Sequence, residues 1–183
     1  MREDLLVYHA SPVLAGIKAA NLFQIRSEDT SYVRCLIKTW QGCVKKCPSC
    51  DLHFRLIAKK NKGYLVLVYR KNQLEKILQD EEIQSFIEQL GYNSNNIDSC
   101  LKTLSQRLRI QDFPHEIGLF LGYPLDDVKA FIENKGQNFI LNGTWKVYSE
   151  KEKKQKIFNS YQQTKIRNIN LLKEGCPISK LVS

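Results

Sequence analysis

Residues 113–127 read Phe113-Pro114-His115-Glu116-Ile117-Gly118-Leu119-Phe120-Leu121-Gly122-Tyr123-Pro124-Leu125-Asp126-Asp127. Proline and glycine bracket this apolar run at both ends, which predicts a short buried strand and a helix that starts just after Tyr123. His115 then lies where the strand begins, at the edge of the core. A histidine there is either structural, with its hydrogen bonds satisfied, or a catalytic base. The catalytic interpretation requires a second catalytic residue close to it.

A candidate partner site lies near the other end of the chain, in Tyr8-His9-Ala10-Ser11-Pro12-Val13-Leu14. Ser11 as N-cap and Pro12 at the first helical position predict a helix that continues to Phe23 and packs on the core. Residue 10 then lies beside a helix N-terminus, where the helix dipole favours a thiolate or an oxyanion. The residue at this position is alanine.

The composition predicts one folded domain. The chain has 183 residues, of which 43% are hydrophobic, enough for a sizeable core. No apolar run is long enough to span a bilayer and no signal peptide is expected, so the prediction is a cytoplasmic protein with no membrane partner. Its six cysteines are then expected to be reduced. We expect a single domain over 1–183, with a loose tail from about residue 175.

The chain is basic, with 28 lysines and arginines against 19 acidic residues and a net charge of +9. Such a surface attracts an acidic partner: a nucleic acid, an anionic membrane face, or an acidic protein such as an acyl carrier. Charge alone does not choose among these three classes.

The periodicity along the chain predicts an α+β fold. Residues 31–40 fit a helix or a strand, and a helix is favoured. Ser149 and Glu152 have the spacing of a capping box that opens the last helix. The expected elements are a hairpin of strands at 51–58 and 64–70, helices at 74–90, 97–108, 126–134 and 149–172, and strand-like pieces at 139–141 and 144–148.

Four potential metal ligands fall within eleven residues: Cys43, Cys47, Cys50 and His53. A Cys-x2-Cys step that contains proline can form a zinc knuckle, but a zinc site normally takes its second pair of ligands from a distant segment. Reduced loop cysteines are therefore the favoured interpretation, and no metal is predicted. Gly118 and Gly122 do not form a phosphate-binding loop, because they stand four apart inside a strand pattern.

Several segments together resemble a family of small bacterial proteins known as a domain of unknown function. They are residues 8–18, 65–70, 113–128 and 143–148, and the resemblance covers most of the chain. Members of this family carry a cysteine directly after the histidine that corresponds to His9, whereas this chain has Ala10. The alanine is either an engineered change that silences a nucleophile or a natural loss. Both interpretations imply that this chain lacks covalent activity.

The resemblance extends to the papain-fold, cysteine-protease-like amide synthases of closthioamide biosynthesis. It implies a papain-like α+β domain in which an N-terminal helix carries the nucleophile position and packs on an antiparallel sheet. The order along the chain would be residue 10, then His115, then a polar residue that orients the imidazole. Residues 139–145, Phe-Ile-Leu-Asn-Gly-Thr-Trp, are similar to the Asn-Trp ending of the papain strand, so Asn142 is the chosen orienter. Asn142 also fits a turn residue before Gly143.

The activity implied by the resemblance is amide formation in non-ribosomal peptide biosynthesis. An acyl group on the phosphopantetheine thioester of a carrier protein would acylate a cysteine at position 10, and a diamine would then resolve the acyl-enzyme. A thioester is already activated, so no cofactor is expected. Asp126 and Asp127 are candidates for binding the amine, although they also fit the first turn of a helix. Two alternatives stay open: a cysteine hydrolase of the same fold, and a non-enzymatic, basic metal- or nucleic-acid-binding protein.

Overall fold

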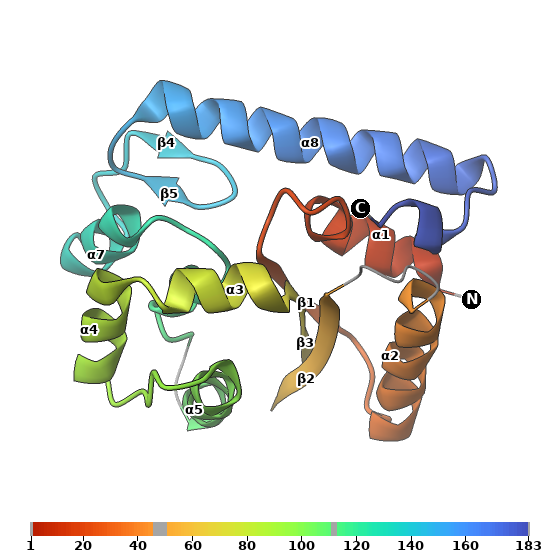
Figure 1. The fold of residues 1–183 in the computed structure, drawn as a ribbon, viewed down its shortest axis with the longest axis horizontal. Helices are drawn as coiled ribbons and strands as arrows, with labels where there is room; N and C mark the ends of the chain where they lie inside the picture. The colour runs from red at the N-terminus through yellow and green to blue at the C-terminus, as the bar shows by residue number, and fades with distance from the viewer. Residues whose placement is uncertain (1, 46–50, 111–112, 183) are drawn as a thin grey trace.

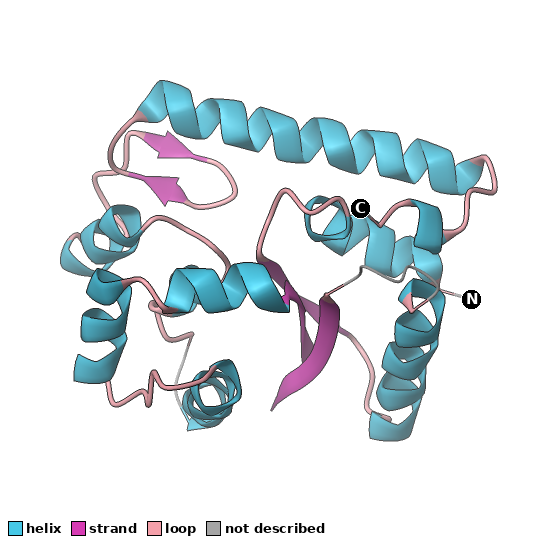
Figure 2. Cartoon of the chain, in the orientation of Figure 1, coloured by secondary structure: helices cyan, strands magenta, loops and turns pink. Residues whose placement is uncertain are grey.

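The computed structural model describes residues 2–45, 51–110 and 113–182, and these form a mixed α+β fold (Figures 1 and 2). A small antiparallel sheet lies at the centre, with helices on both of its faces. The elements in chain order are α1 (Glu3–Leu14), β1 (Ala20–Ile25), α2 (Thr30–Val44), β2 (Leu52–Lys60), β3 (Gly63–Arg70), α3 (Lys71–Leu78), α4 (Glu81–Gln89), α5 (Ile97–Ile110), α6 (Ile117–Phe120), α7 (Leu125–Glu133), β4 (Leu141–Asn142), β5 (Lys146–Val147), α8 (Lys151–Lys173) and the 3-10 turn η1 (Ile178–Lys180).

The central sheet has the strand order β1-β3-β2, and both strand pairs are antiparallel. The predicted hairpin of β2 and β3 is confirmed. Its turn depends on Gly63, which has φ +136° and would place a Cβ against the carbonyl oxygen of Ile25. Every residue of β3 is buried, because this middle strand is covered on both faces.

Alternate residues of β3 face two separate hydrophobic cores. Tyr64, Val66 and Val68 pack with α1, β1 and α2, while Leu65 and Leu67 pack with helices α3 to α7. Figure 1 shows this division, with α1 and α2 to the right of the sheet and α3, α4, α5 and α7 to its left. The sheet therefore separates the N-terminal helices from the segment that carries His115.

Helix α8 lies across the top of the molecule in Figure 1, over α1 at one end and over the β4-β5 hairpin at the other. Trp145, Val147 and Phe158 form a third, smaller hydrophobic cluster between the hairpin and α8. Lys154 of α8 is 2% exposed, and its ammonium lies 2.8 Å from Oδ2 of Asp127 in α7. This buried ion pair fixes the start of α8 to α7.

The buried side chain of Arg70 joins the end of β3 to the end of α1. Its Nε donates a hydrogen bond of 2.9 Å to the carbonyl oxygen of Val13, and Nη2 donates to that of Leu14. Nη1 also lies 3.3 Å from Oδ1 of Asp51. The guanidinium thus supplies a donor to the Leu14 carbonyl and a second donor to the Val13 carbonyl, which also accepts from the backbone N–H of Gly16.

The predicted strand at 113–122 is wrong, because its apolar core forms the short helix α6. Backbone hydrogen bonds within the segment close its turns, such as Leu121 N to Ile117 O at 3.1 Å and Tyr123 N to Gly118 O at 2.9 Å. The run is buried on all sides, so its apolar pattern carries no period that distinguishes a strand from a helix.

The predicted helix from Pro12 to Phe23 is also wrong. Helix α1 begins at Glu3, contains Pro12 and ends at Leu14, and residues 20–25 form strand β1. Pro12 removes the hydrogen bond that an N–H at position 12 would donate to the carbonyl of Tyr8, and the helix ends two residues later at Leu14. Ser11 is not an N-cap, since its Oγ donates a 2.6 Å hydrogen bond to the carbonyl of Val7.

Two expectations near the C-terminus are wrong as well. The tail is not loose, because Ile178, Leu181 and Val182 are buried in the core that contains α1 and α2. Ser149 does not open a capping box, since its Oγ donates to Asp126 at 2.6 Å. The predicted helices at 31–40, 74–90, 97–108 and 126–134 are confirmed, with α3 and α4 as a pair.

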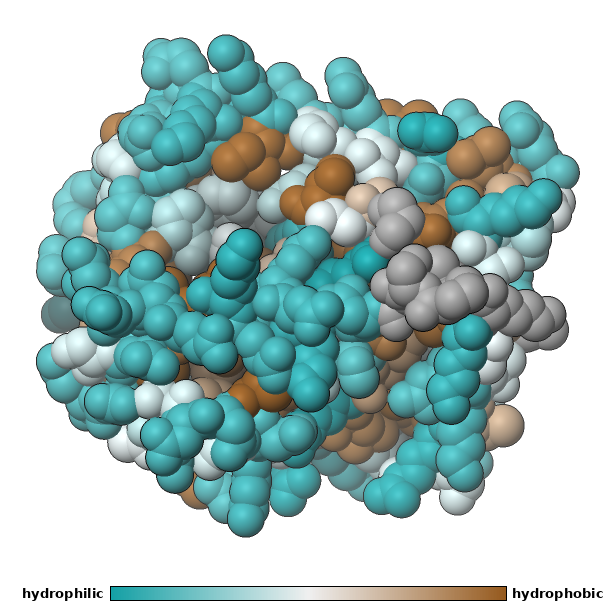
Figure 3. Space-filling model, in the orientation of Figure 1, coloured by the Kyte–Doolittle hydropathy of each residue, from teal (hydrophilic) through white to brown (hydrophobic). Residues whose placement is uncertain are grey.

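The face shown in Figure 3 is mainly hydrophilic, with scattered hydrophobic patches. Within the described ranges 2–45, 51–110 and 113–182, no helix combines the length and apolar character needed to cross a membrane.

Candidate functional site

A cavity of about 350 Å³ lies between the His115 segment, α7 and the β4-β5 hairpin. Its wall is mainly apolar, includes four aromatic side chains and carries a small number of polar side chains, as is typical of small-molecule sites. The aromatic residues that line it are Phe113, Tyr123, Phe131 and Trp145, and the polar residues include His115, Asp127, Asn142, Thr144 and Lys146. The structure therefore brings His115 and Asn142 to one cavity.

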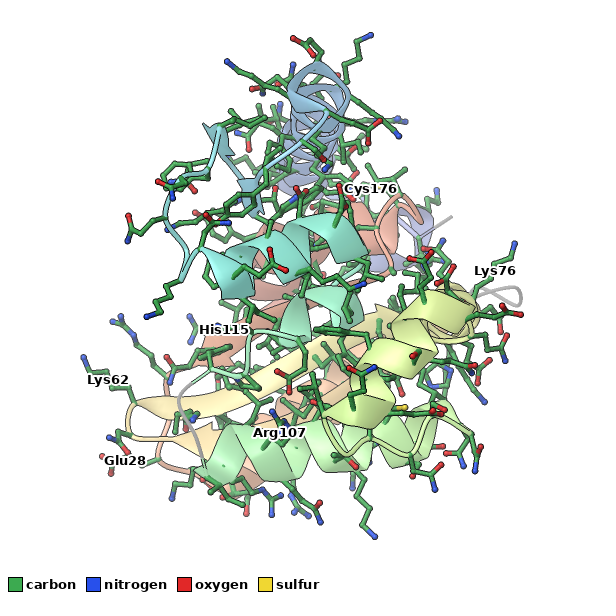
Figure 4. All side chains as sticks on the ribbon, turned by 90° about the vertical axis from the view of Figure 1, so that its left-hand side faces the viewer. Glu28, Lys62, Lys76, Arg107, His115 and Cys176 are labelled. Carbon is green, nitrogen blue, oxygen red and sulfur yellow. The ribbon has the colours of Figure 1, made fainter. Side chains whose placement is uncertain are left out.

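His115 lies in the loop between α5 and α6, below α7 and above the helix that carries Arg107 in Figure 4. Its imidazole is exposed and meets the ring of Phe131 edge to face, with 5.1 Å between the ring centroids. Asn142 is paired with Lys146 in the hairpin. Among the described residues, no hydrogen bond joins His115 to Asn142, so they share a cavity without forming a catalytic pair.

The residue after His115 fixes the loop. Glu116 is 3% exposed, and its Oε1 accepts hydrogen bonds from the hydroxyl of Tyr92 at 2.8 Å and from Nε of Arg107 at 2.6 Å. Burial and the neighbouring Glu116 carboxylate raise the pKa of Tyr92, so its hydroxyl stays protonated and continues to donate. These bonds hold the backbone that presents His115 to the cavity.

Asp127 lines the cavity but has its carboxylate oxygens occupied. Oδ2 accepts from Nε1 of Trp145 at 2.7 Å and lies 2.8 Å from the ammonium of Lys154, while Oδ1 accepts from the backbone N–H of Tyr148 at 2.8 Å. The side chain is 1% exposed. Asp127 thus serves as a structural link between α7, the hairpin and α8.

Asp126 is the more accessible of the two predicted amine-binding residues, with a side chain that is 56% exposed. Burial acts to raise its pKa, but the hydrogen bond from Ser149 and the charge of Lys154 outweigh this and hold the pKa below the ordinary value. Asp126 is therefore a carboxylate at neutral pH, beside the cavity rather than in its wall.

Ala10 does not line this cavity. Its side chain has no exposed surface and packs with Leu6, Val7, Val13 and Leu14 of α1, in the core on the other face of the sheet from α6. A longer side chain at position 10 would point into that core in the present arrangement. The structure thus brings together two of the three predicted catalytic residues, His115 and Asn142, and leaves Ala10 apart from them.

A second cavity, of about 240 Å³, lies between α1, the start of β1 and α8. Thr144 lines both cavities, and Tyr123 contacts residues of each. The Tyr123 hydroxyl donates to the carbonyl of Thr144 at 3.3 Å, and its ring centroid is 5.3 Å from the ammonium of Lys18. The residues that line the second cavity are Tyr8, His9, Pro12, Lys18, Asn21, Thr144, Phe158, Tyr161, Gln162 and Lys165.

Lys18 is the functional candidate that sequence reasoning missed. It is 4% exposed, and its Nζ donates a 2.7 Å hydrogen bond to Oδ1 of Asn21. Burial lowers the pKa of Lys18 to about 7, because no carboxylate in the described part of the chain compensates its charge. The sequence feature that could have identified it is a lysine inside the apolar run from Gly16 to Ala20. Lysine is rarely buried in proteins unless its charge is paired.

The predicted ligand cluster of Cys43, Cys47, Cys50 and His53 is only partly described, because residues 46–50 lie outside the described ranges. Cys43 packs against the core that contains α1 and α2. His53 pairs with Tyr69, which faces the opposite core, and stacks on its ring at 5.5 Å between centroids. Cys43 and His53 thus lie on opposite faces of the sheet. No group of three potential metal ligands occurs among the residues that the structure describes.

These observations define an α+β protein with two adjoining cavities, one mainly apolar and one rich in cationic side chains. The chain belongs to the protein family of unknown function DUF3793, whose pattern matches residues 6–182. No curated protein and no solved structure matches the chain significantly.

Proposed function

We propose that this chain is an acyltransferase that forms an amide bond between an acyl group carried as a thioester and an amine. The observation that carries the proposal is that His115 and Asn142, distant in sequence, line one mainly apolar cavity of about 350 Å³. Such a cavity suits an apolar acyl chain, and the imidazole on its wall suits proton transfer at the reacting end. The resemblance to amide synthases of closthioamide biosynthesis supports the same reaction.

In the proposed reaction the nitrogen of the amine attacks the thioester carbonyl carbon. The new C–N bond forms as the C–S bond breaks, and the thiolate leaves. His115 takes a proton from the attacking nitrogen and returns it to the leaving sulfur, so protons balance and no cofactor is consumed. Asn142 is the residue proposed to orient the imidazole, and its side-chain amide would have to turn toward His115, to which it is not hydrogen-bonded in this structure.

A route through an acyl-cysteine intermediate requires a cysteine at position 10. This covalent route stays a prediction. Ala10 has no exposed surface, so a thiol there needs α1 to move before it can meet a substrate. We therefore propose direct transfer from the thioester to the amine for this chain. The papain-like arrangement is also part of the proposal. Helix α1 packing on an antiparallel sheet supports it, and the helical rather than extended segment after His115 departs from it.

The proposed substrates are the acyl phosphopantetheine thioester of a carrier protein and a diamine. The net charge of +9 suits docking of an acidic carrier protein. Of the two aspartates considered for the amine, Asp126 is the better candidate, because the carboxylate oxygens of Asp127 already have partners.

The test is to incubate the chain with an acyl-carrier thioester and a diamine and to measure amide formation by mass spectrometry. We expect amide formation that falls about 100-fold or more in His115→Ala, a typical loss for a general base, and less in Asn142→Ala. Lys102→Met, an exposed change on α5, serves as the control. An Ala10→Cys variant that forms an acyl adduct would establish the covalent route instead. No amide from the unchanged chain and no adduct on Ala10→Cys would refute the proposal.

A further inference from the structure

The wall of the second cavity contains basic side chains and no acidic one. Three basic side chains line it, Lys18, Lys165 and His9, and none of its lining residues is an aspartate or a glutamate. The remaining polar residues, Asn21, Thr144, Tyr8, Tyr161 and Gln162, all carry groups that can donate hydrogen bonds. A cavity with this lining is complementary to an anion.

The ammonium of Lys18 is the centre of this cavity. It has three N–H donors, and one of them binds Oδ1 of Asn21. The amide nitrogen of Asn21 in turn donates to the backbone carbonyl of His9, so the Asn21 side chain cannot turn away from Lys18 without losing that bond. A buried ammonium in a rigid position, with donors to spare and no carboxylate beside it, lacks its counter-charge.

The second lysine reaches the same space from α8. The ammonium of Lys165 lies 3.4 Å from the centroid of the Tyr8 ring, and its charge acts on His9. Burial, and then the charge of Lys165, lower the pKa of His9 below its ordinary value, so this imidazole is neutral at neutral pH. Lys18, from the segment before β1, and Lys165, from α8, line the same cavity, so both can contact one anion while His9 stays uncharged.

We propose that this cavity is a binding site for the anionic group of a small molecule, a carboxylate or a phosphate, with Lys18 as its principal counter-charge and Lys165 as the second. A charged oxygen beside Lys18 would accept the free donors of the ammonium and remove the cost of burying it. The site is separate from the proposed acyl-transfer cavity, although Thr144 borders both.

The site also links binding to pH. Lys18 has a pKa of about 7, and the titratable groups that face it are His9 and Tyr8 from α1, Tyr123 after α6, and Tyr161 and Lys165 from α8. Burial raises the pKa of both Tyr123 and Tyr161, and His9 is already neutral above pH 7. Loss of the Lys18 proton between pH 7 and 9 should therefore weaken anion binding.

The test is isothermal titration of the full chain with inorganic phosphate and, separately, with acetate, in a buffer without other oxyanions. We expect saturable binding, and the binding of acetate, whose own charge is constant in this range, should weaken as the pH rises from 7 to 9. Tighter binding of phosphate identifies a phosphorylated ligand, and tighter binding of acetate identifies a carboxylate. Lys18→Met should weaken binding about tenfold or more and remove the pH dependence, since it deletes a charge-assisted hydrogen bond.

Lys165→Met should weaken binding to a smaller extent, and Lys102→Met, an exposed change on α5, should leave it unchanged. Circular dichroism of each variant shows whether the fold is retained. Lys18→Arg keeps the charge and should keep measurable binding, which separates charge from packing. Equal affinity in the unchanged chain and in a folded Lys18→Met variant, or no saturable binding of either anion, would overturn the proposal. Both outcomes are independent of acyl-transfer activity.

Discussion

Replacing Lys18 by methionine should make the protein more stable at neutral pH. The ammonium is 4% exposed and has no carboxylate partner in the described part of the chain, so the folded state must hold either a desolvated charge or a neutral amine. Methionine has a similar length and no charge, so it fits the same space without this cost. The gain in stability should vary with pH, because the cost that methionine removes arises from the protonation of the Lys18 amine.

The magnitude follows from the pKa of Lys18, which burial lowers from 10.5 to about 7. This difference corresponds to about 5 kcal/mol of folding free energy. The unfolded chain binds more protons than the folded chain between pH 7 and 10.5, so the stability of the unchanged protein rises with pH across this window. Below pH 7, Lys18 is protonated in both the folded and the unfolded chain, so the full destabilisation from burying its charge is present. The variant also leaves Oδ1 of Asn21 without its donor, which destabilises the folded state by about 1–3 kcal/mol.

The net expectation is that Lys18→Met is more stable than the unchanged chain by about 2–4 kcal/mol at pH 6. The difference should shrink by about 1.4 kcal/mol for each pH unit between pH 7 and 10. Urea unfolding followed by tryptophan fluorescence at several pH values measures it, in a buffer free of phosphate and carboxylates. Lys102→Met, which is exposed, is the matched control. A stability difference that does not change between pH 6 and 10 would refute the reasoning.

Three further substitutions test how the elements are joined. Lys154→Met leaves the carboxylate of Asp127 buried without its cation, so it should lower the free energy of unfolding in urea by about 3–5 kcal/mol. Adding Asp127→Asn should recover part of this loss. Equal stability of the single and double variants would contradict the pairing. Gly63→Ala should lower stability by about 2 kcal/mol or more, because residue 63 has φ +136° and the alanine Cβ would meet the carbonyl of Ile25. The measurement is the thermal unfolding midpoint, and an unchanged midpoint would argue against that turn. Arg70→Met removes the side-chain donor of the Leu14 carbonyl and one of the two donors of the Val13 carbonyl, and it should cost about 1–3 kcal/mol by the same unfolding assay. A loss within experimental error would show that the Leu14 carbonyl finds another donor.

Elements with a clear period could be predicted from the sequence. The β2-β3 hairpin has alternating apolar residues in β2, a run rich in β-branched and aromatic residues in β3 and a glycine after its turn, and helices α4 and α5 have apolar residues at helical spacing. The segment after His115 could not be predicted correctly, because a short run that is apolar at every position fits a buried strand and a buried helix equally well. Pro12 misled the prediction, since proline is favoured at the first position of a helix but here lies in the last turn of α1.

The candidate site was predictable only in part. His115 and Asn142 were identified from the sequence and line one cavity. Ala10 was not predicted correctly. The predicted helix start at Ser11 put residue 10 beside a helix N-terminus, whereas in the structure residue 10 lies within α1 and faces the core. Lys18 was missed because its significance comes from burial beneath Tyr123 and α8, elements far away in the sequence. Charge patterns along a chain do not report which lysine becomes enclosed.

The packing of Ile178, Leu181 and Val182 against α1 and α2 has a consequence for the order of events on the ribosome. Residues 178–182 are synthesised after α1, α2 and the sheet, the elements with which they share this core. The core that contains α1 therefore stays incomplete until residues 178–182 have left the ribosome. A variant truncated before residue 178 would lack this part of the core, and it should be a substrate for chaperones rather than a nearly native protein.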